Sequence, residues 1–152
     1  MEYFDNITIV LVLYNSHEVI ENCLDGFSQD QKIICVDNAS TDASAELVLR
    51  LHPQAKIIKN DENRGFGSAA NQAMALVDTS YILLLNPDSV MNPGAIFQLF
   101  EFAENNPNTG IVAPYLSIPN KGLELDLKGP KGITYNIPLT IPEGPFSTWF
   151  AT

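Results

Sequence analysis

Basic residues are scarce in this chain of 152 residues, which has 8 Lys and Arg against 18 Asp and Glu and a formal net charge of −10. The few basic residues are scattered along the sequence. Nucleic acids and anionic membrane surfaces bind clustered basic faces, so neither is expected as a partner.

Long apolar runs are also missing, since no run approaches the roughly 18 residues that a membrane-spanning helix needs. The chain begins with MEYFDN, which is acidic where a signal peptide would be basic. We therefore expect a cytoplasmic protein, which would reach the inner face of the membrane only through partners.

Cysteine and histidine are rare as well. Cys23 and Cys35 lie in apolar periodic segments without C-x-x-C or His spacing, which predicts reduced packing residues. His17 and His52 have no second ligand-type residue at metal spacing, so we expect both on the surface.

What the sequence does contain is a regular alternation of short apolar runs and helical patterns, with a hydrophobic fraction of 45% that suits one globular domain. The apolar runs show little polar alternation, as in strands covered on both faces. This order predicts an α/β fold, with a mostly parallel sheet and helices on both faces. The expected strands are 7–13, 32–36, 55–59, 81–85 and 110–114, and the expected helices carry the stripes Val19–Phe27, Phe66–Val77 and Ile96–Ala103, the last capped by Asn92 and Pro93.

The composition changes at Pro114, from which point six of the ten prolines occur and no helical stripe is found. We therefore divide the chain into an α/β domain over 1–114 and an extension over 115–152. A hairpin is expected around Gly129 and Pro130. The terminal FSTWFAT is apolar and has no stop signal, so we expect an incomplete element that exposes apolar surface and favours self-association.

Polar loops follow four of the expected strands, at 14–16, 37–42, 60–67 and 86–89, and Asn, Asp, Ser and Gly dominate them. Turn chemistry alone favours these residue types. In open α/β sheets, however, ligands bind beyond the carboxyl ends of the strands. We therefore expect Asp37 and Asp88, which close or follow buried strands, to converge on one cleft.

The motifs LYNS, VDNASTD, NRGFGSAANQ and LLLNPDS stand in these loops, in that order. Together they resemble the N-terminal half of the family 2 glycosyltransferases, which have the Rossmann-like GT-A fold, and especially their rhamnosyltransferase-like members. The match covers about residues 7–114. The resemblance implies an inverting enzyme that moves a sugar from a UDP or dTDP donor to a hydroxyl of a saccharide or lipid-linked acceptor.

The resemblance also implies roles around the nucleoside. Tyr14 and Asn15 would line the base pocket, and Asp37 would accept the N3 hydrogen of uracil or thymine. Asn38 and Ser40 would lie near the base and the ribose. A plain capping or turn role is the alternative for Asp37, Asn15 and Ser40, and likewise for Asn71 and Asp88.

On the phosphate side, Gly65 and Phe66 would form the floor under the nucleotide, with Asn71 turned toward it. Phe66 heads an apolar stripe, so a core position is the alternative. Asn86 and Asp88 occupy the family's Asp-x-Asp position, where the last carboxylate binds a divalent metal that bridges the two phosphates.

The charge balance supports a metal independently of the resemblance. A diphosphate adds about two negative charges to a chain that already carries −10, and Arg64 is the only basic residue in the four loops. We expect Arg64 to assist and Mg²⁺ or Mn²⁺, which prefer oxygen ligands, to supply most of the positive charge.

The sequence departs from the family at two points. Asn86 replaces an Asp, and the family's Glu-Asp motif, which holds the general base, does not occur before Thr152. Asp126 and Glu143 do not follow that pattern. The 152 residues are therefore expected to be inactive in transfer by themselves.

Other functions stay open to different degrees. A non-catalytic module that binds a nucleotide sugar or a partner is the main alternative to an enzyme. A nucleotidyltransferase would need a Gly-rich basic loop after the first strand, and a dinucleotide-binding oxidoreductase would need G-x-G-x-x-G; the sequence has neither.

Overall fold

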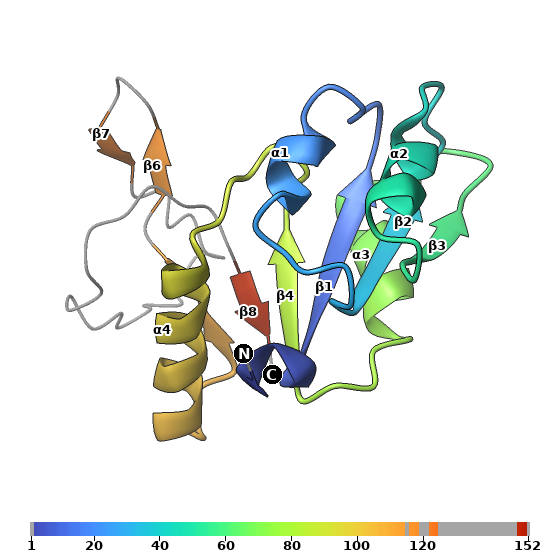
Figure 1. Cartoon of the computed structure of the whole chain (residues 1–152). Helices are drawn as coiled ribbons and strands as arrows, with labels where there is room; N and C mark the ends of the chain where they lie inside the picture. Colours follow the sequence, from blue (N-terminus) through green and yellow to red (C-terminus); the bar gives the residue numbers. More distant parts are fainter. Residues whose placement is uncertain (1, 115, 119–121, 125–148, 152) are drawn as a thin grey trace.

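The computed structural model of the chain describes residues 2–114, 116–118, 122–124 and 149–151. The hairpin expected around Gly129 and Pro130 lies outside these residues. From residue 7 to residue 112, strands and helices alternate along the chain, as the sequence predicts (Figure 1).

A six-stranded sheet forms the centre of the fold, in the order β3-β2-β1-β4-β8-β5. The first four strands in sequence are parallel, and their arrowheads point to the same end of the sheet in Figure 1. A separate antiparallel pair joins β6 to β7. The bounds are β1 Ile7–Leu13, β2 Ile33–Asp37, β3 Lys56–Lys59, β4 Tyr81–Leu85, β5 Ile111–Val112, β6 Leu116–Ile118, β7 Gly122–Glu124 and β8 Trp149–Ala151.

The helices lie on both faces of this sheet. One apolar cluster joins α1, α2 and α4 to one face, and a second cluster joins α3 to the other. No helix in the described ranges is long and apolar enough to cross a membrane. The bounds are α1 Ile20–Leu24, α2 Ser44–Leu51, α3 Phe66–Met74 and α4 Pro93–Asn105, with a short 3-10 helix η1 at Glu2–Asn6.

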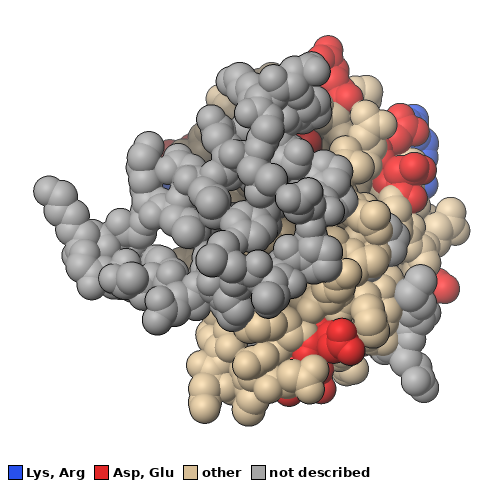
Figure 2. Space-filling view, turned by 90° about the vertical axis from the view of Figure 1, so that its left-hand side faces the viewer, with Lys and Arg blue, Asp and Glu red and all other residues tan. Residues whose placement is uncertain are grey.

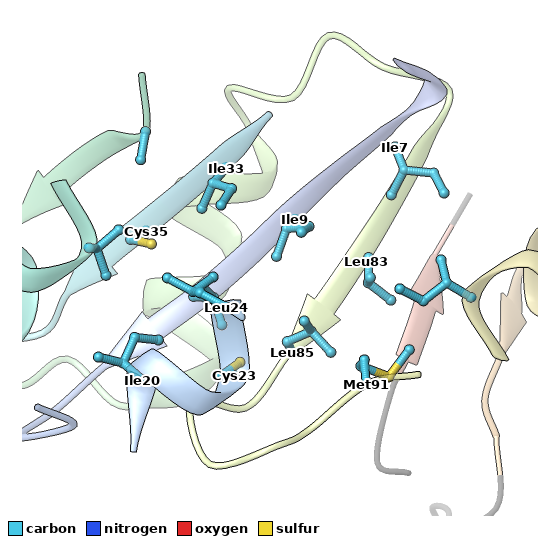
Figure 3. Close-up of a cluster of buried hydrophobic side chains, with 14 of the residues drawn as sticks. Ile7, Ile9, Ile20, Cys23, Leu24, Ile33, Cys35, Leu83, Leu85 and Met91 are labelled. Atoms are coloured by element: carbon cyan, nitrogen blue, oxygen red, sulfur yellow. The ribbon is translucent and has the colours of Figure 1, made fainter. Parts of the chain in front are cut away.

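Alternation along β1 explains why this strand is buried over its whole length. Ile7, Ile9 and Leu11 enter the larger cluster, whereas Val10 and Val12 enter the smaller one. Figure 3 shows the larger cluster, in which side chains of β1, β2 and β4 face those of α1. A strand with helices on both sides favours apolar residues at every position, and β1 departs from this only at Thr8, whose buried hydroxyl is hydrogen-bonded to the Thr79 hydroxyl.

The edge strand β3 differs from this expectation. Lys56 and Lys59 are exposed and Ile57 and Ile58 are only partly buried, so the prediction that every strand is covered on both faces is wrong here. Charged residues at a sheet edge are common because they discourage pairing with another chain.

The C-terminal residues also differ from the expectation. Trp149–Ala151 do not form an unpaired apolar end, because β8 pairs antiparallel with β4 on one side and with β5 on the other. The apolar segment 146–150 lies partly outside the described residues, so its exposure and the self-association expected from it stay predictions.

The prediction for the two cysteines is confirmed, whereas the prediction for His52 is wrong. Cys23 and Cys35 are free and buried, which confirms their packing role. His52 was expected on the surface but is only 3% exposed at the C-cap of α2. Its imidazole hydrogen-bonds the Leu24 carbonyl, and Nδ1 has no hydrogen-bond partner.

Basic residues, which are few in the sequence, are also few among the described residues on the one face of the structure that Figure 2 shows. On the face shown in Figure 2, Lys and Arg form no broad patch among the described residues, and Asp and Glu lie in separate groups.

Candidate functional site

The polar loops predicted from the sequence start at one edge of the sheet. In the parallel register, Leu13 pairs with Asp37 and Leu11 pairs with Leu85. The loops after β1, β2 and β4 therefore leave the same carboxyl edge, at the upper end of the sheet in Figure 1. This confirms the shared edge for Asp37 and Asp88. A single cleft that contains both carboxylates stays a prediction.

Hydrogen bonds tie the loop after β1 to the loop after β2. Asn15 has a left-handed backbone, with φ of 52°, and its N–H donates to Ser40 Oγ at 3.1 Å. Asn15 Oδ1 accepts from the Thr41 N–H at 2.8 Å. Asp37 is 8% exposed, and its Oδ1 accepts from the Ser40 N–H at 2.9 Å. Three predicted site residues are thus brought together.

Asp42 is an anchor that the sequence analysis did not single out. Its carboxylate accepts from the backbone N–H groups of His17 and Ser44, each at 3.0 Å, and from the Ser44 hydroxyl. Burial acts to raise the pKa of Asp42, but these hydrogen bonds outweigh it and hold the pKa below its ordinary value. An Asp side chain that accepts from the N–H two residues further on forms an Asx turn, and Asp before a Ser-initiated helix is the sequence signal for it.

A hollow of about 510 Å³ opens between these two loops. The predicted residue Asn15 lines it, and Asp37 and Asp88 do not. The remaining lining residues are His17, Glu18, Val19, Asp42 and Ala43.

Asn38 lies at the centre of a hydrogen-bonded group of amide side chains. It is 2% exposed, its Oδ1 accepts from Asn60 Nδ2 and from the Arg64 N–H, and its Nδ2 donates to Asn63 Oδ1. Asn60 is bonded in turn to Gln72 on α3. No role was predicted from the sequence for Asn60, Asn63 or Gln72.

The start of α3 presents the next predicted residues. Gly65 has φ of 77°, a backbone conformation that glycine adopts without strain, and it precedes the helix. Phe66 is 48% exposed, so the alternative that it is a core residue is wrong. Arg64 and Asn71 are exposed as well.

The Asn86-Pro87-Asp88-Ser89 turn follows β4. The Ser89 N–H donates to the Asn86 carbonyl at 3.0 Å, and Cys23 Sγ donates to the same carbonyl at 3.5 Å. Burial and then the nearby charge of Asp88 raise the pKa of Cys23 to about 12. The side chains of Asn86 and Asp88 are exposed.

This turn suits a metal that takes part of its ligands from a substrate. Among the described residues, no group of three or more His, Cys, Asp and Glu side chains is placed to hold an ion. Mg²⁺ sites often combine one or two carboxylates with substrate phosphates and water. The exposed Asp88 carboxylate, with the Asn86 amide two residues before it, fits that donor set.

Comparison of the sequence with known proteins identifies relatives that are named as sugar-polymer synthases or glycosyltransferases. A poly-beta-1,6-N-acetyl-D-glucosamine synthase of Staphylococcus aureus is 28% identical over 127 residues, which cover 80% of this chain and 31% of that protein. A poly(ribitol-phosphate) beta-glucosyltransferase of Bacillus spizizenii is also 28% identical over 127 residues, with 77% and 20% covered. The chain thus spans about a third or less of the length of these relatives.

Solved structures share the fold. The mannosyltransferase PcManGT of Pyrobaculum calidifontis, in complex with GDP-Man and Mn²⁺, matches with a TM-score of 0.65 and 23% identity over 73% of this chain and 35% of that one. Residues 1–349 of S. aureus TarS, in complex with UDP-GlcNAc, match with a TM-score of 0.66 and 19% identity over 78% and 37%. The fold is therefore that of the GT-A glycosyltransferases.

The sequence model described as "Glycosyl transferase family 2" matches residues 8–144, which is most of the chain. The chain therefore belongs to glycosyl transferase family 2.

Proposed function

We propose that this chain is the donor-binding part of an inverting glycosyltransferase that uses a UDP or dTDP sugar. The observation that carries the proposal is the placement of Asp37 and the Asp88 turn at one carboxyl edge of a parallel sheet. The family match over 8–144 supports it. The related structures that hold UDP-GlcNAc or GDP-Man and Mn²⁺ are in keeping with a nucleotide-sugar donor.

The nucleoside would bind at the ends of β1 and β2. Tyr14 is 54% exposed, and its backbone N–H is held by Ser16 Oγ, so its ring is accessible to stack on a base. Asp37 is fixed by the Ser40 N–H, and a carboxylate at this position would accept the N3 hydrogen of uracil or thymine. Asn15 and Ser40 would hold the two loops at the right separation.

The diphosphate would bind between Arg64 and the Asp88 turn. Asp88 would hold a divalent metal, with Asn86 beside it, and the bound ion would offset the negative charge that develops on the departing nucleotide. Arg64 would neutralise phosphate charge from the other side. A saccharide or a lipid-linked saccharide would accept the sugar.

Calorimetric titration of UDP with Mn²⁺ or with EDTA tests this assignment. Asp88→Asn should remove the gain in affinity that Mn²⁺ gives, because the ion loses its carboxylate. Asp37→Asn should weaken binding about equally with and without the ion, because it changes the contact with the base.

The matched control is Asp30→Asn. Asp30 is exposed and precedes β2, at the opposite edge of the sheet, so the same loss of charge should leave both titrations unchanged. Equal affinity for UDP in EDTA and in Mn²⁺ for the unsubstituted chain would rule out the assignment of Asp88.

A further inference from the structure

Four amide side chains form a connected group behind the predicted diphosphate site, and we call this group the amide network. Its members are Asn38 after β2, Asn60 after β3, Asn63 in the following loop and Gln72 on α3. Asn38 and Asn60 are buried, with 2% and 9% of their surface exposed. The side chains of these two residues are hydrogen-bonded to each other inside the protein.

Asn38 uses its whole side chain within the network. Its Oδ1 accepts from Asn60 Nδ2 and from the Arg64 N–H, both at 3.0 Å. Its Nδ2 donates to Asn63 Oδ1 at 2.7 Å, and the same Asn63 oxygen accepts from the Gly65 N–H at 2.9 Å. Asn38 therefore fixes the backbone at the end of the loop.

Asn60 and Gln72 fix the start of the same loop against α3. Gln72 Oε1 accepts from Asn60 Nδ2 at 2.9 Å, and Gln72 Nε2 donates to Asn60 Oδ1 at 3.2 Å. The Asn60 N–H donates to the Asp37 carbonyl at 2.9 Å, which continues the pairing of β2 with β3. The loop is thus held at both ends by hydrogen bonds from these side chains.

The shape of this loop decides which charge meets a ligand. Residues 61–64 contain Asp61, Glu62 and Arg64, and all three side chains are exposed. A diphosphate is attracted by Arg64 and repelled by the two carboxylates. A loop free to rearrange would mix these charges, whereas a hydrogen-bonded network with two buried members, Asn38 and Asn60, favours one arrangement.

From this geometry we propose that the amide network positions Arg64 for the diphosphate of the donor, so that Asn38, Asn60 and Gln72 are positioning residues. Asn38 acts through the loop rather than by touching the nucleotide. The inference rests on the proposed function, because it requires a diphosphate as the ligand.

The variant Gln72→Met tests the proposal without changing the charge. It removes both hydrogen bonds to Asn60 and keeps a side chain of similar length. We expect the affinity for UDP in Mn²⁺ to fall about tenfold, as loss of hydrogen bonds of ordinary strength predicts. The affinity for uridine, measured by NMR titration, should not change, because uridine has no phosphate.

A double-mutant cycle with Arg64→Ala separates positioning from general stability. In the Arg64→Ala background, Gln72→Met should cause no further loss of UDP affinity. Gln98→Met on the exposed face of α4 is the matched control and should leave every titration unchanged. Asn63→Ala is the second variant, since Asn63 is exposed and its loss frees the Gly65 N–H without opening the core.

The outcomes are distinguishable. The positioning role would be overturned if Gln72→Met lowered the affinities for UDP and uridine equally, or if the losses of UDP affinity were additive in the double-mutant cycle. If Gln72→Met fails to fold, an unchanged UDP affinity in Asn63→Ala would overturn it. A chain that binds no UDP in Mn²⁺ would overturn the proposed function and the inference with it. Unchanged UDP affinity in a folded Gln72→Met variant would overturn the inference alone.

Discussion

Polar side chains at the carboxyl edge of the sheet fall into two groups. Asn38 and Asn60 are buried and hydrogen-bonded within the protein. Tyr14, Arg64 and Asp88 are exposed. Exposed groups can meet a ligand at little desolvation cost, whereas buried and bonded groups fix the geometry in which they do so.

His52 gives the protein a pH dependence at the residue scale. Burial lowers its pKa, while the bond to the Leu24 carbonyl acts in the opposite direction. Below pH about 6.5 the unfolded chain takes up a proton that the folded chain resists, so stability is complete above this pH and falls below it. For one titrating group, the free energy of unfolding can fall by at most about 1.4 kcal/mol per pH unit.

Urea unfolding of the wild-type chain and of His52→Gln at pH 7.5 and 5.5 measures this effect. The variant keeps a donor for Leu24 and cannot titrate, so its free energy of unfolding should change less between the two pH values. His17→Gln, which removes the other histidine at an exposed position, should retain the wild-type dependence. An equal change in the free energy of unfolding between pH 7.5 and 5.5 for the wild type and His52→Gln would contradict the role of His52.

At the scale of elements, α4 directly follows the proposed metal turn. Asn92 is its N-cap, with Oδ1 accepting from the Gly94 N–H at 2.8 Å and proline at the first turn. The start of this helix therefore fixes where the chain leaves the Asp88 turn. A weaker cap would loosen both the helix and that exit.

Asn92→Ala should lower the free energy of unfolding by about 1 kcal/mol, the usual effect of losing an N-cap. Urea denaturation checks the value. Asn108→Ala, in the exposed segment between α4 and β5, is the matched control and should stay within about 0.5 kcal/mol of wild type. A similar loss in both variants would show that the effect does not come from the cap.

At the scale of the whole molecule, we expect the chain to bind the sugar donor without transferring the sugar to an acceptor. A positioned general base contributes about 10² to 10⁴ in rate, and the Glu-Asp motif that the resemblance associates with that base does not occur before Thr152. We expect this chain to bind the donor and to release nucleotide only by slow hydrolysis, since water needs no acceptor site.

Nucleotide release from UDP and dTDP sugars, with and without saccharide acceptors, tests this expectation. Acceptor-dependent turnover on the order of 1 s⁻¹, ordinary for an enzyme, would contradict it. Asp126 and Glu143 would then be the first residues to replace.

Local patterns were enough to predict much of this molecule. The strands 7–13 and 81–85 and the Asn92 cap followed from short apolar runs and cap chemistry, which act within a few residues. The ordered loop motifs led to the family, and the matched residues 8–144 confirm it.

Only the tertiary structure decided contacts between segments that are distant in sequence. His52 is buried because it packs by Leu24, the exposed lysines of β3 follow from its edge position, and Trp149–Ala151 insert between β4 and β5. The amide network also joins three elements through residues up to 34 positions apart, Asn38 to Gln72. The sequence by itself determined the local elements and the polar character of the loops, because those depend on neighbours along the chain. Burial and hydrogen-bond partners depend on which elements meet in space, so they were settled only by the folded sheet.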